Sequence, residues 1–384
     1  MTFDEFKQEV VDNIKDFLPV EYQDASVSIQ DVIKNNDTHL SGLTIRKEDT
    51  GIAPTLYLED FYNQVESGEH SLNGVLARIA DTYDQAMNND ISKQAMGLVE
   101  NITDYDATKD KIIPRVVNRE SNEERLKSLP HKEIGNDLAV TYHVELGNDE
   151  GGQMSVAVSN QMMENYGVSV GELHEQACQN MQASPANFES IAETLAHLMI
   201  PGYDEMSLEE KAVAREGFDM PDPGMYVLTN ESKVFGAAEM LDPATMDTIT
   251  EQVGEFYILP SSVHEVLIVP KREDMNLSDL EAMVQEVNST QVAPNEVLSD
   301  HVYEYDTETK EIYRADKAEE HMKAKEASKA EKSEKSQKTE KTAEKRPSLK
   351  ANLEEKKKEV SEKSKDHKEL TKERTQSIGG RKHE

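Results

Sequence analysis

Charge is distributed along this 384-residue chain in two blocks of opposite sign. From Lys317 to Glu384 there are 21 Lys and Arg against 15 Asp and Glu, a net charge of +6, whereas the preceding residues contain 21 basic and 61 acidic side chains, a net charge of −40. The last aromatic residue is Tyr313. A segment rich in Lys, Glu, Ala and Ser buries too little apolar surface to offset the entropy lost on folding. We therefore expect a folded body up to Arg314 and a disordered or partly helical tail after it.

The first part of the body mixes helix and strand patterns. Apolar residues spaced by three and four predict a helix over residues 3–18, which Thr2 and Glu5 would cap and Pro19 would end. Alternating apolar residues between 25 and 45 predict a β-hairpin with its turn at 35–37. The same criteria predict helices over 55–65, 72–87 and 120–129, and a strand over 111–117.

The second part continues this mixture. A hairpin is predicted over 138–158, helices over 169–181 and 187–199, and a flexible insertion with one short helix over 201–223. Next come a strand at 226–229, an apolar segment at 234–240, a helix at 243–253, strands at 256–259 and 263–269, and a helix at 277–287. The continuous apolar run 266–269 is typical of a strand that is covered on both faces.

These patterns predict an α+β (mixed α/β) fold in which helices pack on mixed or antiparallel sheets. They divide the chain into an N-terminal α+β region over 1–130, a C-terminal α/β region of the same body over 131–315, and a Lys/Glu-rich tail over 316–384. Within the tail, Pro347 and the Glu/Lys pairs at 354/358 and 359/363 favour a short helix.

The expected compartment is the cytoplasm. A single cysteine, Cys178, excludes an intramolecular disulfide and suits a reducing environment. The N-terminal residues do not have the pattern of a signal peptide, and no continuous apolar run approaches the roughly 18 residues of a transmembrane helix.

The acidic body also limits the expected partners. Binding to phosphates depends on Lys and Arg, so a body with a net charge of −40 is expected neither to bind nucleic acid directly nor to bind a membrane. The same field attracts cationic molecules. We therefore expect protein partners with basic surfaces, and the sequence leaves the oligomeric state open.

Few residues point to chemistry. The motifs GxxxxGK[ST], GxGxxG and GxSxG are absent. The segment with Ser261, Ser262 and His264 could hold a nucleophile and a base, but residues i and i+2 of a strand lie roughly 6.6 Å apart, which favours a turn with His264 bonded to backbone. Asn230 lies in a polar segment after a predicted strand. These four are candidate ligand-binding residues, and no catalytic residue is assigned.

Metal ligation is not expected either. His174 and Cys178 are spaced by four on a predicted helix, but two ligands do not make a site. The acidic residues between 204 and 222 lack the spacing of a calcium-binding loop. No metal and no cofactor are predicted.

Six runs of the body together carry a family resemblance: FLPVEYQDASVSIQDVIKNN, LSGLTIRKEDTGIAPTLYL, LPHKEIGNDLAVTYHVEL, MYVLTNESKVFGAA, FYILPSSVHEVLIVP and EVNSTQVAPNEVLSDHVYEYD. Over residues 1–315 the chain resembles an uncharacterised bacterial family, domain of unknown function 5688, whose members are often encoded near mobile-element genes. The resemblance supplies no catalytic residues and implies an accessory protein of a mobile element.

Three functions are compatible with these observations. The leading hypothesis is a non-enzymatic, acidic protein-interaction module with a tail that extends its electrostatic reach or serves as a solubilising linker. The alternatives are an acidic DNA mimic that occupies a nucleic-acid-binding protein, and a small-ligand or hydrolytic enzyme that uses Ser261, Ser262 and His264 with Asn230 nearby.

Overall fold

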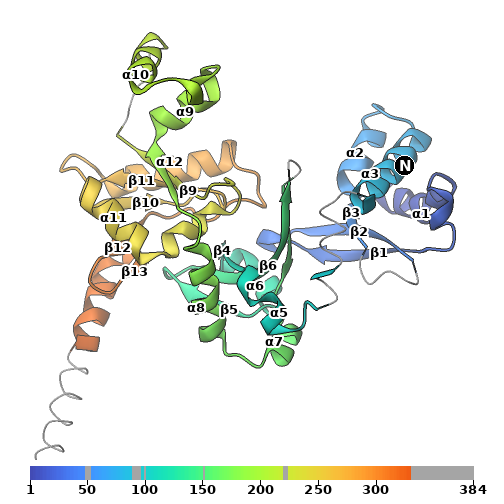
Figure 1. Ribbon diagram of the computed structural model, residues 1–384, viewed down its shortest axis with the longest axis horizontal. Coiled ribbons are helices and arrows are strands. Elements are labelled where there is room, and N and C mark those ends of the chain that lie inside the picture. Colours follow the sequence, from blue (N-terminus) through green and yellow to red (C-terminus); the bar gives the residue numbers. More distant parts are fainter. Residues whose placement is uncertain (48–52, 89–96, 99–100, 150–151, 219–223, 330–384) are drawn as a thin grey trace, which may run out of the picture. The chain divides into compact units, whose positions relative to one another are not determined.

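The computed structural model describes residues 1–47, 53–88, 97–98, 101–149, 152–218 and 224–329 (Figure 1). The chain divides into two units, Met1–Ala318 and Glu319–Glu384. The first unit contains three sheets, and every strand pairing among the described residues is antiparallel. This arrangement of helices on antiparallel sheets confirms the predicted α+β fold.

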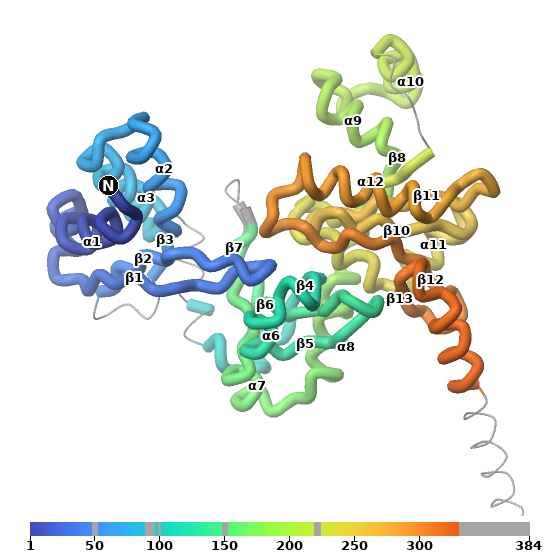
Figure 2. Tube along the Cα trace, turned by 180° about the vertical axis from the view of Figure 1, so that it is seen from behind, coloured from blue at the N-terminus to red at the C-terminus, as the bar shows by residue number. Residues whose placement is uncertain are grey.

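Residues 1–88 build a small sheet and three helices around their own core (Figure 2). The elements are α1 (Phe3–Asn13), β1 (Ser26–Ile33), β2 (His39–Arg46), β3 (Thr55–Tyr57), α2 (Glu59–Glu66) and α3 (Leu72–Asn88). The predicted capping box of Thr2 and Glu5 is present, and the predicted hairpin is β1–β2. Residues 55–57 are a strand rather than the start of a helix, because they pair with β2 beside Gly42, where a Cβ atom would lie 2.6 Å from Thr55 Cγ2.

The turn of the β1–β2 hairpin contacts the later part of the body. Asn36 has a left-handed backbone (φ 56°), and its amide group donates to the carbonyl oxygens of Pro294 and Val297, both at 2.8 Å. The buried Asn122 side chain donates to Asn36 Oδ1 at 3.0 Å. Polar residues predicted the turn of the hairpin. The structure shows in addition that this turn is hydrogen-bonded to residues distant in the sequence.

The second sheet is built around β6 (Leu138–Asp149). Its partners are β4 (Ile112–Asn118), β5 (His131–Ile134) and β7 (Gly152–Ala157). Pro114 is tolerated in β4 because this strand lies at the edge of the sheet, where the missing N–H is not needed. Three short helices contribute to the apolar clusters of this sheet: α5 (Tyr105–Thr108), α6 (Glu123–Leu126) and α7 (Asn160–Tyr166). The longer helix α8 (Val170–Met181) packs against the sheet through Leu173 and Ala177.

The third sheet has the strand order β13-β12-β10-β11-β9-β8. Its strands are β8 (Asn187–Ser190), β9 (Tyr226–Thr229), β10 (Phe256–Leu259), β11 (Val266–Pro270), β12 (Tyr303–Asp306) and β13 (Glu311–Arg314). Val266 and Ile268 join one apolar cluster with α11 (Pro243–Val253), while Val269 joins another with α12 (Leu277–Thr290). The expectation that the apolar run 266–269 is covered on both faces is therefore confirmed.

Two helices differ from their predicted extent because tertiary pairing decides the ends. Residues 187–190 form β8, which pairs with β9, so α9 (Ile191–Met199) begins only after Ser190. The helix predicted over 120–129 contains only α6 after a 3-10 turn at Glu120–Asn122. The predicted short helix of the insertion is α10 (Leu208–Gly217).

A buried polar network ties β6 to the third sheet. The Tyr303 hydroxyl donates to Asp137, which precedes β6, and its oxygen lies 2.8 Å from Ser299 Oγ. Ser299 Oγ donates to Asp137 Oδ2 at 3.3 Å, and Arg314 Nη1 lies 3.7 Å from the same oxygen. All three buried residues are at most 5% exposed, so each depends on the others for its hydrogen bonds.

Residues 319–329 of the second unit are helical. The tail from 330 onward, including the helix predicted after Pro347, lies outside the described residues. Over the described ranges, no helix has both the length and the apolar character needed to cross a membrane.

Candidate functional site

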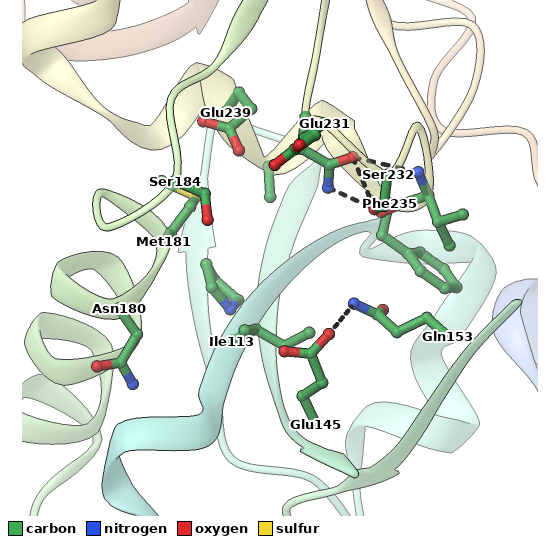
Figure 3. Close-up of a pocket in the computed structure, with 14 residues that line it drawn as sticks. Ile113, Glu145, Gln153, Asn180, Met181, Ser184, Glu231, Ser232, Phe235 and Glu239 are labelled. Atoms are coloured by element: carbon green, nitrogen blue, oxygen red, sulfur yellow. Dashed lines mark hydrogen bonds between the residues drawn. The ribbon is translucent and has the colours of Figure 1, made fainter. Parts of the chain in front are cut away.

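A cavity of about 470 Å³ lies beside the loop that follows β9 (Figure 3). The second sheet contributes Ile113 and Pro114 of β4, Glu145 of β6 and Gln153 of β7, and the C-terminal end of α8 contributes Asn180 and Met181. The loop after β9 and the 3-10 helix Gly236–Leu241 supply the opposite side. Three carboxylates line the cavity: Glu145, Glu231 and Glu239. None of the described residues that line it is Lys, Arg or His.

Glu239 is the most buried of these carboxylates. It lies in the 3-10 helix after the loop, and 5% of the residue is exposed. Burial, together with the neighbouring carboxylate of Asp242, raises the pKa of Glu239 to about 7. Among the described residues, no side chain or backbone group forms a hydrogen bond or ion pair with its carboxyl group. Because a buried charge without a partner is costly, ionised Glu239 favours a bound donor or cation.

Glu145 faces the cavity from the other side, and its charge is partly compensated (Figure 3). Gln153 Nε2 donates to Glu145 Oε1 at 3.0 Å, and Arg115 Nη2 donates to Gln153 Oε1 at 2.6 Å. The Arg115 guanidinium also lies 3.5 Å from the centre of the Phe235 ring. Desolvation, assisted by Arg125, lowers the pKa of Arg115 to about 9. Arg115, Gln153 and Glu145 thus form one chain of hydrogen bonds, and the last two residues line the cavity.

The loop after β9 is held by its own side chains. Asn230 Oδ1 accepts from the Val234 N–H at 3.2 Å and from Ser232 Oγ at 3.0 Å, while Asn230 Nδ2 donates to the Val234 carbonyl at 2.9 Å. Lys233 and Phe235 have left-handed backbones, with φ of 54° and 55°. Such a backbone is unusual for a bulky residue such as Phe235 and needs support from its surroundings.

His264 provides part of this support. Its Nδ1 accepts from the Phe235 N–H at 3.2 Å, and its carbonyl oxygen accepts from Thr229 Oγ1 at 2.8 Å. On the other side of the ring, Nε2 lies 3.5 Å from Glu296 Oε1. The imidazole therefore joins the loop after β9 to the segment around residue 296.

The structure brings only part of the candidate set together. Asn230 lines the cavity, whereas Ser261, Ser262 and His264 are not among the residues that line it. The Ser262 hydroxyl accepts from the His264 backbone N–H at 3.0 Å, and the Ser261 carbonyl accepts from the Leu298 N–H at 3.0 Å. For the described residues, no hydrogen bond joins either serine hydroxyl to the His264 ring.

His174 and Cys178 do lie together on α8, with Nε2 and Sγ 3.7 Å apart, and His174 Nδ1 is 3.2 Å from the Tyr142 hydroxyl. Burial raises the pKa of the Cys178 thiol to about 11 and lowers the pKa of His174 to about 4. The pair is thus largely uncharged near neutral pH. In the part of the chain that the structure describes, no three His, Cys, Asp or Glu side chains are placed to hold a metal ion.

The acidic residues between 204 and 222 are only partly described, because Asp219 and Asp222 lie outside the described residues. Among the others, Asp204 pairs with His197, and Glu210 Oε2 accepts from the backbone N–H of Ser207 at 2.8 Å, capping α10.

Sequence reasoning missed Glu145, Gln153, Asn180 and Glu239 because they come from four separate elements. One local signal was available. Glu239 is the single charged residue in the otherwise apolar run 234–241, and a charged side chain in such a run is a candidate for function when the run is buried. The other residues share no motif, and only the packing of α8 and the β9 loop against the second sheet brings them together.

A model of the family described as "Family of unknown function (DUF5688)" matches residues 3–307. No curated protein and no solved structure matches the chain. Every residue that lines the cavity lies within the matched range.

Proposed function

The chain belongs to the family of unknown function DUF5688, whose description assigns no activity, and we propose that the protein is a non-enzymatic binding module for basic protein partners. In this proposal the cavity beside the β9 loop receives a Lys or Arg side chain of the partner.

The observation that carries the proposal is the environment of Glu239. Its carboxyl group is buried at the cavity, and the described residues provide it with neither a hydrogen bond nor a counter-charge. At about 4 Å, and with an effective dielectric constant of about 20, a cation would gain roughly 4 kcal/mol of Coulomb energy from one carboxylate, before desolvation is subtracted. An ammonium or guanidinium group is therefore the ligand chemistry that best satisfies this position.

The polar residues around Glu239 suit such a ligand. Glu231 adds a second, exposed carboxylate, and Ser184 adds a hydroxyl. Glu145 on the far wall is partly compensated through Gln153, so the charge of the cavity is concentrated on the side of Glu239. The net charge of −40 over the first 316 residues would steer basic partners toward the protein.

A catalytic role has less support. The Ser262 hydroxyl and the His264 ring each bond to backbone N–H groups, and neither residue lines the cavity. A general base in the cavity would have to be Glu239 itself, whose pKa near 7 suits that role. This second candidate predicts substrate turnover that is lost in Glu239→Gln, whereas a binding module shows no turnover.

The test is the affinity of the full chain for a fluorescein-labelled basic peptide of alternating Gly, Lys and Arg, measured by fluorescence anisotropy at pH 8. Glu239→Gln is the test variant. The matched control is Glu273→Gln, which removes one negative charge at an exposed position outside the cavity. We expect Glu239→Gln to weaken binding by about tenfold, or about 1.4 kcal/mol, and Glu273→Gln to change it by less than about twofold. Equal effects of the two substitutions would mean that binding is purely long-range and that the cavity is not the site.

A further inference from the structure

Apolar side chains are exposed together on the segment that contains α9 and α10. Six of the ten large apolar residues that are exposed among the described residues fall between 195 and 218. Five of them are more than half exposed: Leu198 at 75%, Met199 at 59%, Leu208 at 87%, Val213 at 70% and Phe218 at 52%. Exposed apolar residues that occur singly need no explanation, whereas a cluster marks a contact surface.

Helix α9 has one buried face and one exposed face, and its large apolar residues lie on the exposed face. The helix buries the small side chains of Ala192 and Ala196 and exposes Leu195, Leu198 and Met199, which share one face at spacings of three and four. A helix that only had to cover the protein would present its large apolar residues to the core. The exposed face of α9 is therefore available for contact with another molecule.

A groove lies on α10. The helix itself lies near α9 in both views (Figures 1 and 2). The groove has a volume of about 390 Å³, and its apolar surface comes from Met206, Val213 and Ala214. Glu209 and Glu210 form its acidic rim. A groove of this kind fits large apolar side chains from a partner that also carries positive charge.

The two basic residues of the segment contact other residues of the same segment. Over residues 187–217 there are seven acidic and two basic residues, a net charge of −5. Arg215 Nη1 bonds to Glu193 Oε2 at 2.8 Å, and Lys211 Nζ lies 4.7 Å from the centre of the Tyr203 ring. Among the described residues that line the groove, the charged ones are Glu209 and Glu210.

We infer that the groove of α10 and the exposed face of α9 form a docking surface for a basic amphipathic helix of a protein partner. The apolar side of that helix would enter the groove, and its Lys or Arg residues would meet Glu209 and Glu210. A second copy of this chain is disfavoured, because it would place like charges of −5 against each other. An anionic membrane surface is disfavoured for the same reason. This surface is separate from the cavity beside the β9 loop and does not depend on the function proposed for that cavity.

The experiment measures binding of a fluorescein-labelled 14-residue Leu/Lys peptide with an amphipathic helical pattern to the full chain. Two peptides serve as comparisons: one in which Glu replaces every Lys, and one in which the same Leu and Lys residues are scrambled to remove the apolar face. We expect the Leu/Lys helix to bind at least about tenfold more tightly than either comparison peptide, because both apolar contact and charge complementarity are required.

Val213→Asp separates apolar docking from simple charge attraction. The substitution adds a negative charge, so purely electrostatic binding would become stronger, whereas insertion of apolar side chains into the groove would be lost. We expect affinity to fall by about tenfold or more. Val20→Asp is the matched control, since Val20 is 88% exposed at a position remote in sequence, and it should leave affinity unchanged.

Glu209→Lys is a second variant that leaves the apolar floor intact, and it should weaken the Leu/Lys helix while improving binding of the Leu/Glu peptide. Unchanged or tighter binding by Val213→Asp would overturn the inference. So would self-association of the wild-type chain in sedimentation velocity that Val213→Asp abolishes, because the groove would then be filled by a second copy.

Discussion

Replacing Glu239 by Gln should make the protein more stable above pH 7 and leave its stability nearly unchanged below pH 5. Glu239 has a pKa of about 7 in the folded protein against the ordinary value of 4.5, because burial and the Asp242 carboxylate disfavour its charged form. Between these two pH values the folded chain holds a proton that the unfolded chain has released. Stability from this group is thus fully present below pH 4.5 and is lost as the pH rises through 7.

The difference between 4.5 and about 7 corresponds to about 3 kcal/mol, at about 1.4 kcal/mol for each tenfold change in the ionisation constant. Glutamine has the shape of the neutral acid but does not ionise. We therefore expect Glu239→Gln to raise the free energy of unfolding by about 3 kcal/mol at pH 8 and by less than about 1 kcal/mol at pH 5.

Urea unfolding followed by far-ultraviolet circular dichroism at pH 5, 6.5 and 8 measures this difference, and the method suits a chain without Trp. Glu273→Gln, at an exposed position, is the control for removal of one negative charge. A Glu239→Gln protein that is no more stable than the wild type at pH 8, or a gain that does not depend on pH, would refute the reasoning. The former result would mean that the carboxylate already has a partner in solution.

Three further predictions concern Gly236 in the 3-10 helix beside the cavity, the buried Tyr303 and Cys178 on α8. Gly236→Ala should destabilise the protein by about 2 kcal/mol or more in thermal unfolding, because its Cβ atom would lie 2.7 Å from the His264 carbonyl oxygen. Tyr303→Phe should lower the free energy of unfolding in urea by roughly 1 to 3 kcal/mol, since it leaves the buried Asp137 without the tyrosine hydroxyl. Cys178, with a pKa of about 11, should react with iodoacetamide at pH 8 about two orders of magnitude more slowly than a free cysteine; a rate equal to that of free cysteine would contradict its burial.

The local patterns of the sequence were sufficient for the elements that need no distant partner. The capping box of Thr2 and Glu5, the helix α8 after Ser169 and the apolar run 266–269 were all predicted from spacing and are present. They could be predicted because capping and periodicity depend on neighbours within a few residues.

Strands added at sheet edges could not be predicted in the same way. Residues 55–57 and 187–190 have helix-compatible patterns, and they are strands only because β2 and β9 offer them an edge. The hairpin of β12 and β13 was likewise not predicted. The edge that β12 extends belongs to β10, more than forty residues earlier in the chain. A local window contains no information about such an edge.

The sequence by itself determined the negative net charge of the body, the positive net charge of the tail, the α+β composition and the family to which residues 3–307 belong. Only the tertiary structure decided which carboxylate is buried and which apolar side chains are exposed. It buries Glu239 at a cavity in which no described residue pairs with its carboxyl group, and it exposes large apolar residues of α9. The physical reason is that composition fixes the total charge and apolar area, whereas the cost of a charge and the exposure of a side chain depend on which distant elements pack around it.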